Sequence, residues 1–259
     1  GGDREGNRKG LRNALIITTG IMLLEFAGGL WTNSLALLSD SGHMLSDAAS
    51  LALSLTAIWF ASRPPSPSKT YGFYRFEILA ALLNGITLFV VAGFIAWEAF
   101  QRFGEPPEVA SGAMIAIAAI GLGANAASAW ALMRQGDIRG NVNLRSAYLH
   151  IVGDALGSVG ALGAGLLMLL FEWYVADPII SVLVAVLILR SAWGVLKQSV
   201  HILMEGAPAA VDHADVRETL MPIDGGRDVH DLHIWTITSG MDSLSCHLLV
   251  RDEADHQHI

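Results

Sequence analysis

The sequence predicts an α-helical membrane protein, in which a bundle of six transmembrane helices precedes a small cytoplasmic α+β domain. Apolar residues make up 53% of the 259 residues and charged residues only 15%, whereas a soluble domain has about 25% charged residues. The apolar residues gather in six segments, each with the roughly 20 residues that a helix needs to cross a bilayer. After about residue 205 the chain becomes polar and rich in histidine, which indicates a second, water-exposed domain.

The six apolar segments define a transmembrane domain over residues 1–205. The fourth segment contains no charged residue, and the fifth contains only Asp154, with Glu172 just past its end. Several segments exceed the minimal length of a span, so we expect helices that tilt or protrude into water. We place the helices near 13–31, 35–61, 77–101, 110–133, 146–171 and 178–200.

The distribution of basic residues predicts the orientation of these helices. Ten lysines and arginines flank the N-terminus and the second-to-third and fourth-to-fifth connections, whereas the opposite connections carry Arg102 among acidic residues. By the positive-inside rule, both termini lie in the cytoplasm. The compact chain favours a bacterial inner membrane, and the net charge of −8 gives no indication of a nucleic-acid partner. The ten residues are Arg4, Arg8, Lys9, Arg12, Arg63, Lys69, Arg75, Arg134, Arg139 and Arg145.

Two segments within the predicted spans share the pattern His-x-x-x-Asp. One runs from His43 to Asp47 in the second span, and the other from His150 to Asp154 in the fifth. Residues four apart lie on one face of a helix, so each segment aims an imidazole and a carboxylate in the same direction. An Asp at the centre of a membrane helix costs roughly 2.5–3.5 kcal/mol, so such a group usually marks an ion or substrate path. Asp40 lies on the same face as His43 and is expected to support it.

Four such groups, two nitrogen and two oxygen donors, are enough to bind one tetrahedral Zn²⁺. Cd²⁺, Co²⁺, Fe²⁺ and Mn²⁺ fit the same donors, because selectivity among these metals depends on geometry and availability. An imidazole titrates near pH 6.5 and binds metal only when it is neutral, so metal and protons compete for it. The residues therefore predict a transporter that exchanges a divalent metal for protons.

Three other interpretations compete with the transporter. The His/Asp pairs could be hydrogen-bonding contacts between helices, but identical spacing on two separate spans favours metal. A membrane metalloenzyme needs an open coordination position and a nearby base, and no His-Glu-x-x-His signature is present, so we predict no enzyme. A membrane metal sensor or scaffold, which would bind the ion without flux, stays open.

Further polar and small residues lie within the spans. Glu25, Asn84 and Asn125 either line the ion path or bond between helices, and for the asparagines we favour bonds between helices. Small residues three and four apart let membrane helices approach closely. The fifth span has such a series at Gly153, Gly157, Gly160, Gly163 and Gly165.

Residues 206–259 predict the start of a small α+β domain. A short helix over 211–221 precedes strands over 229–238 and 243–250, which a turn at 239–242 joins. We expect this domain to be incomplete at residue 259. The single cysteine, Cys246, excludes an intrachain disulfide, so the fold does not depend on an oxidising compartment.

Three stretches of the chain resemble the cation diffusion facilitator family, in particular its zinc/cadmium/cobalt exporters and the eukaryotic zinc transporters. They are residues 34–47 (SLALLSDSGHMLSD), 148–160 (YLHIVGDALGSVG) and 229–235 (VHDLHIW). The resemblance covers nearly the whole chain from residue 11. It implies a six-helix membrane domain, a ferredoxin-like metallochaperone domain in the cytoplasm, and a homodimer. It also implies that His43, Asp47, His150 and Asp154 carry Zn²⁺ outward in exchange for protons.

The resemblance bears on several other residues. With His at position 43, the chain resembles the zinc-preferring branch of the family. Members with Asp at this position accept more metals. His230 and His247 resemble cytoplasmic ligands of a regulatory zinc in some members, although they could equally be ordinary strand residues. Arg75 resembles a basic residue that ties the dimer together near the inner membrane face, with Glu205 as its candidate partner. Some relatives bind a further ion in the connection after the second helix, but residues 70–75 contain no His, Cys or Asp, so we expect no metal there. Many relatives have a histidine-rich stretch after the fourth helix that is thought to collect metal, but residues 134–143 contain no His, so we do not expect this connection to collect metal.

Overall fold

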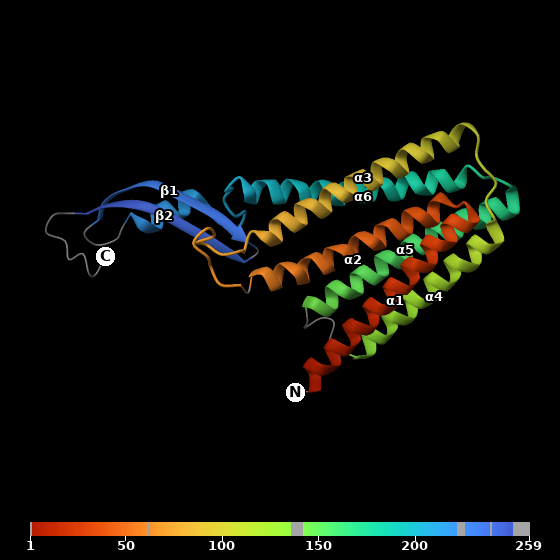
Figure 1. Ribbon diagram of the computed structural model, residues 1–259, viewed down its shortest axis with the longest axis horizontal. Helices are drawn as coiled ribbons and strands as arrows, with labels where there is room; N and C mark the ends of the chain where they lie inside the picture. The colour runs from red at the N-terminus through yellow and green to blue at the C-terminus, as the bar shows by residue number, and fades with distance from the viewer. Residues whose placement is uncertain (1, 62, 136–141, 222–225, 239, 251–259) are drawn as a thin grey trace. The chain divides into compact units, whose positions relative to one another are not determined.

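The computed structural model describes residues 2–61, 63–135, 142–221, 226–238 and 240–250 (Figure 1). Six long helices stand where the sequence predicts six spans. Over the described residues, four of them are long and apolar enough to cross a membrane: Phe76–Gly104, Ser111–Ala131, Ile151–Phe171 and Ala176–Leu203. The six helices are α1 (Gly2–Thr32), α2 (Leu35–Ala61), α3 (Phe76–Gly104), α4 (Ser111–Gln135), α5 (Val142–Phe171) and α6 (Ala176–Leu203).

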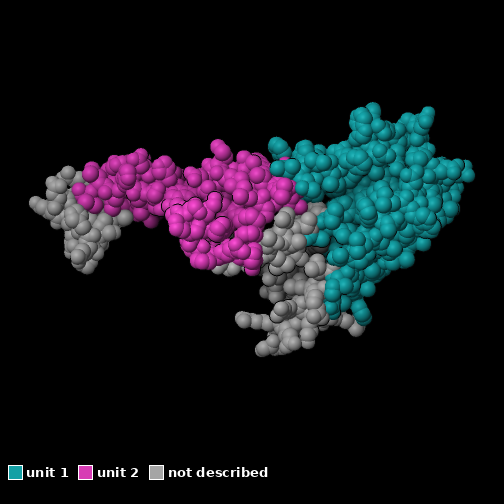
Figure 2. All heavy atoms as spheres, in the orientation of Figure 1, with its two compact units in different colours: residues 1–52, 86–193 teal, residues 53–85, 194–259 magenta. Residues whose placement is uncertain are grey.

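The chain divides into two compact units, which Figure 2 distinguishes by colour. The first unit comprises Gly1–Ala52 and Ile86–Trp193, and the second comprises Leu53–Gly85 and Gly194–Ile259. This division passes through α2, α3 and α6, so it differs from a boundary at residue 205. The separation of a membrane domain (1–205) from a cytoplasmic domain (206–259) stays a prediction from the sequence.

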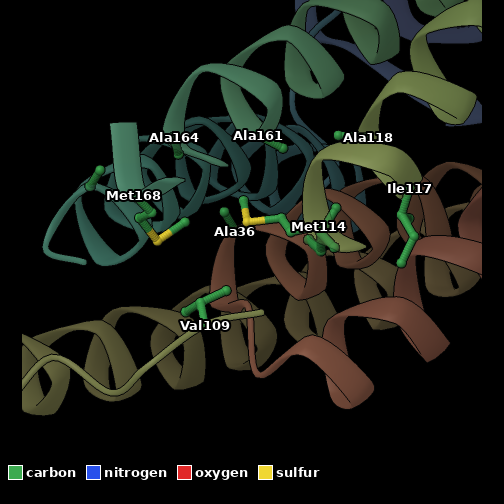
Figure 3. Close-up of a cluster of buried hydrophobic side chains, with 10 residues drawn as sticks. Ala36, Val109, Met114, Ile117, Ala118, Ala161, Ala164 and Met168 are labelled. Carbon is green, nitrogen blue, oxygen red and sulfur yellow. The ribbon is translucent and has the colours of Figure 1, made fainter. Parts of the chain in front are cut away.

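Small side chains and methionines build the core of the first unit. Met114 of α4 and Met168 of α5 are fully buried, and alanines of α2, α4 and α5 surround them (Figure 3). Flexible methionines fill irregular gaps, and alanines let helix backbones approach closely. The outer faces carry large apolar side chains instead, such as Phe94 and Leu187, which are 65% and 61% exposed. This distribution suits helices whose outer surface meets lipid.

An ionic clasp fixes the start of α2, the helix that carries His43. The buried Asp177 carboxylate accepts hydrogen bonds from Ser34 Oγ at 2.6 Å and from two backbone N–H groups in the first turn of α2 at 2.8 and 3.2 Å. Arg102 Nη1 lies 3.6 Å from Asp177 and also donates to the backbone oxygen of Asn33 at 2.7 Å. A carboxylate at a helix N-terminus satisfies its unpaired N–H groups and its dipole. The start of α2 is thereby tied to α3 and α6.

The second unit contains a short helix and an antiparallel strand pair. Asp212 caps α7 (His213–Leu220) by accepting the Ala214 N–H at 2.7 Å. The strands β1 (Gly226–Thr238) and β2 (Met241–Val250) pair His230 with His247. The predicted helix and two strands are therefore confirmed, with both strands beginning a few residues earlier than expected.

We expect Asp177→Ala to lower the free energy of unfolding by about 3–5 kcal/mol, because it leaves three buried donors without their acceptor and removes one of the two carboxylates that lie near Arg102. The midpoint of thermal unfolding in detergent, followed by circular dichroism, measures the effect. Glu108→Ala, which removes an exposed carboxylate of the connection between α3 and α4, is the control. Equal midpoints for the two variants would contradict the clasp.

Candidate metal centre

The two His-x-x-x-Asp patterns lie on α2 and α5, within the first unit. The structure describes the side chains of His43, which is half-buried, and of Asp154, which is 3% exposed. The side chains of Asp47 and His150 lie outside the described part. A four-ligand cage from these residues therefore stays a prediction.

Two further carboxylates connect His43 and Asp154. Asp40 interacts electrostatically with His43, and Glu25 of α1 interacts with both Asp40 and Asp154. Glu25 is 0% exposed and Asp40 is 4% exposed. The structure thus gathers residues of α1, α2 and α5 into one buried acidic cluster, which we define as Glu25, Asp40 and Asp154.

Two glycines make room for this acidic cluster. A Cβ atom on Gly121 of α4 would lie 2.8 Å from Glu25 Oε1, and a Cβ atom on Gly157 of α5 would overlap Asp40 Oδ1. Ser158, next to Gly157, donates to Glu25 Oε1 at 3.4 Å. The glycines on α5 therefore do more than permit close helix packing, because one of them accommodates a carboxylate of α2.

Several buried polar atoms in this region have no hydrogen-bond partner among the described residues. They are Glu25 Oε2, Asp40 Oδ2, both amide atoms of Asn125, and Ser128 Oγ. Buried polar atoms without partners are costly, and they mark places where water or an ion completes the bonding. Among the described residues, the hydrogen bonding of the polar atoms in this part of the first unit is therefore incomplete.

The structure bears on two polar residues whose role the sequence leaves open. Glu25 of α1 accepts a hydrogen bond from Ser158 of α5 at 3.4 Å and lies beside Asp40 of α2, so it bonds between helices. That Glu25 also lines an ion path stays a prediction. For Asn125 we favoured a hydrogen bond between helices, which is wrong among the described residues, since neither amide atom has a partner. Sequence alone does not show which face of α4 meets α1 and α5.

A second group of potential ligands lies on the exposed strand pair of the second unit. Ligand atoms of His230, Asp231 and His247 lie within 4.8 Å of one another, and His247 Nδ1 is 3.1 Å from Asp231 Oδ2. The sequence indicated the two histidines and missed Asp231, because neighbouring strand residues normally point to opposite faces. Here the ladder register shifts between His230 and His233, and Asp231 has φ of 50°. This irregularity turns the carboxylate toward His247.

Arg75 and Glu205 form the predicted ion pair, also in the second unit. Arg75 Nη2 lies 3.4 Å from Glu205 Oε1, and the side chains are 36% and 67% exposed. A pair with this exposure contributes at most about 1 kcal/mol to stability. Its suggested role in tying a dimer together stays a prediction.

Comparisons with known proteins cover nearly the whole chain. Residues 11–204 match the family model described as the cation efflux transmembrane domain, and residues 208–259 match the cytoplasmic domain of cation efflux proteins. The cadmium, cobalt and zinc/H(+)-K(+) antiporter of Bacillus subtilis is 49% identical over 247 residues, which are 95% of this chain and 79% of that protein. Zinc transporter ZitB of Escherichia coli is 44% identical over 253 residues, 97% of this chain and 80% of that protein. The metal cation efflux system protein CzcD of Cupriavidus metallidurans is 40% identical over 244 residues, 94% of this chain and 77% of that protein.

We expect Gly157→Ala to destabilise the protein by about 1–3 kcal/mol, because its Cβ atom would force the Asp40 carboxylate out of place. The control is Gly163→Ala on the same helix, where a Cβ atom meets nothing within 4 Å. That variant should be neutral or slightly stabilising, since Ala is the better helix former. Thermal unfolding midpoints of both variants test the difference, and a Gly157→Ala protein as stable as Gly163→Ala would contradict the packing of Asp40.

Proposed function

Since the chain belongs to the cation efflux family, we propose that it is an antiporter that exports Zn²⁺ from the cytoplasm in exchange for protons. The observation that carries the proposal is the acidic cluster, which lies beside His43 within apolar helices. Named relatives support the same activity, because they include zinc transporters and a cadmium, cobalt and zinc antiporter. Cd²⁺ and Co²⁺ are further candidate substrates. The helices bury titratable groups, but the chain contains no catalytic signature, which favours a transporter over an enzyme.

The proposed topology has six spans with both termini in the cytoplasm of a bacterium and the protein in its inner membrane. The description of residues 208–259 as a cytoplasmic domain supports this orientation, as does the excess of basic residues in the inner connections. The family model of this segment is also named for dimerisation, which supports a homodimer.

The proposed transport site consists of His43, Asp47, His150 and Asp154. Two neutral imidazoles and two carboxylates form a tetrahedral set that favours Zn²⁺. Asp40 would orient His43, as outer carboxylates commonly do for metal-binding histidines, and Glu25 would in turn hold Asp40. When the site faces the outside, protons bind the imidazoles and the metal leaves. When it faces the cytoplasm, the imidazoles release protons and bind the next ion.

The proposed regulatory site consists of His230, Asp231 and His247. Two imidazoles and a carboxylate suit Zn²⁺, and a further ligand from water or a second subunit would complete four. Exposure of all three residues allows the ion to exchange with the cytoplasm. Zinc there would report its cytoplasmic concentration to the transport domain.

We expect Asp154→Ala to reduce Zn²⁺ flux into proteoliposomes at least tenfold, because it removes one of four ligands. Flux is measured with a fluorescent zinc indicator, with and without a pH gradient. Glu105→Ala, an exposed acidic residue between α3 and α4, should retain both flux and its dependence on the gradient. Zinc binding by the wild type without any flux would instead support the sensor or scaffold interpretation.

We expect Asp231→Asn to weaken zinc binding at the regulatory site at least tenfold, because the neutral amide is a poor zinc ligand. Calorimetric titration of the Asp154→Ala protein, in which the transport site is disabled, isolates the second site. Asp242→Asn in the same background is the control, since Asp242 accepts from Thr236 at the other end of the strand pair. Equal affinities for the two double variants would remove Asp231 from the site.

A further inference from the structure

A cavity of about 480 Å³ opens in the second unit between the α2–α3 connection and β1. We call it the interfacial pocket. Its walls combine aromatic and aliphatic side chains with three charged ones. The lining residues are Lys69, Tyr71, Gly72, Phe73, Tyr74, Arg75, Phe76, Leu79, Glu205, Trp235 and Ile237.

Backbone hydrogen bonds and an aromatic contact hold the α2–α3 wall of the interfacial pocket in shape. Ser66 and Lys69 exchange backbone hydrogen bonds of 3.1 and 2.9 Å, and the Gly72 N–H donates to the Lys69 oxygen at 2.9 Å. Gly72 has φ of +77°, a conformation that glycine adopts readily. Phe60 of α2 packs on Phe73 of the connection, with ring centroids 6.3 Å apart and the rings tilted by 47°. The pocket is therefore largely preformed, as binding sites usually are.

The charged side chains of the interfacial pocket favour the binding of an anionic group. Arg75 is paired with Glu205, but the 3.4 Å separation is longer than the 2.7–2.9 Å of a strong charged hydrogen bond. Lys69 is exposed, and its ammonium group forms no ion pair with any residue that the structure describes. Two cations and one carboxylate leave an excess of one positive charge.

An apolar path leads away from the interfacial pocket along α3. Leu79 lines the pocket and is 50% exposed, and Leu83, four residues later on the same helix face, is 60% exposed. Both residues belong to Phe76–Gly104, which is long and apolar enough to span a membrane. A ligand with a polar head and an apolar tail would match this sequence of surfaces.

The position of the pocket indicates where that ligand comes from. One wall precedes a spanning helix, and the other includes Trp235, within the segment matched to the cytoplasmic domain. In the proposed topology the pocket lies at the cytoplasmic membrane surface, where Trp and Tyr gather and basic residues meet anionic lipids.

We propose that the interfacial pocket binds the headgroup of an anionic phospholipid from the cytoplasmic leaflet. Its phosphate oxygens accept hydrogen bonds from Lys69 and Arg75, and an acyl chain lies along Leu79 and Leu83. The lipid phosphate competes with Glu205 for Arg75, so lipid binding loosens that ion pair. The inference rests on the membrane orientation given under the proposed function, and it adds a ligand that is neither the transported ion nor its counter-ion.

The test titrates purified full-length protein in detergent with short-chain phosphatidylglycerol, phosphatidylcholine of the same chain length, and inorganic phosphate. Tryptophan fluorescence reports binding, and Trp235→Phe identifies the part of the signal that arises in the pocket. We expect saturable binding of phosphatidylglycerol at least tenfold tighter than that of phosphatidylcholine. Lys69→Gln should weaken it several-fold, whereas Lys197→Gln, an exposed lysine of α6 outside the pocket, should not.

Equal binding of the two lipids, or an unchanged affinity in Lys69→Gln, would overturn the proposal. Phosphate that binds as tightly as phosphatidylglycerol would also overturn it, by showing an anion site without a lipid tail. Zinc flux of the wild type in phosphatidylcholine vesicles separates this inference from the transport function. Flux without phosphatidylglycerol binding would contradict only the proposed lipid site. Lipid binding without flux would contradict only the proposed transport function.

Discussion

The burial of carboxylates inside apolar helices is the constraint on which the first unit depends. Glu25 and Asp40 are almost wholly enclosed and lie next to each other, although burying such a group without full hydrogen bonding is costly. The neighbouring helices adapt to them: α4 has a glycine opposite Glu25, and α5 has one opposite Asp40. The packing of four helices is thus arranged around polar atoms rather than around the largest apolar side chains.

The same unit fixes α2 at one end and leaves its polar atoms incompletely bonded further along. Asp177, Ser34 and Arg102 hold the first turn through short hydrogen bonds and an ion pair. Asp40 Oδ2, less than two turns into the helix, has no partner among the described residues. The first turn of α2 is thus held by several contacts to α3 and α6, whereas the next turn buries a carboxylate whose hydrogen bonding is incomplete among the described residues.

Local patterns made much of this protein predictable from its sequence. Apolar segments predicted the positions of the six long helices; the fourth, expected near 110–133, is observed at Ser111–Gln135, whereas α1, expected near 13–31, begins at Gly2. Alternation and turn residues located both strands of the second unit. The His-x-x-x-Asp spacing places each His and Asp on one face of its helix, because a helix repeats every 3.6 residues; the metal site that this spacing suggests stays a prediction. Each of these features depends only on residues close together in the chain.

Contacts between distant residues were decided only by the tertiary structure. Glu25 and Asp40 lie on different helices, and nothing in the local sequence of either specifies the rotation that brings their carboxylates together. Asp231 joins the two histidines because a shift in strand register reverses the usual alternation. Asn125 has no hydrogen-bond partner among the described residues, although its position in the span suggested one. The sequence by itself determined the helices and the strands, since these follow from short-range periodicity. The folded chain alone decided which polar groups meet, because that depends on how whole helices and strands pack.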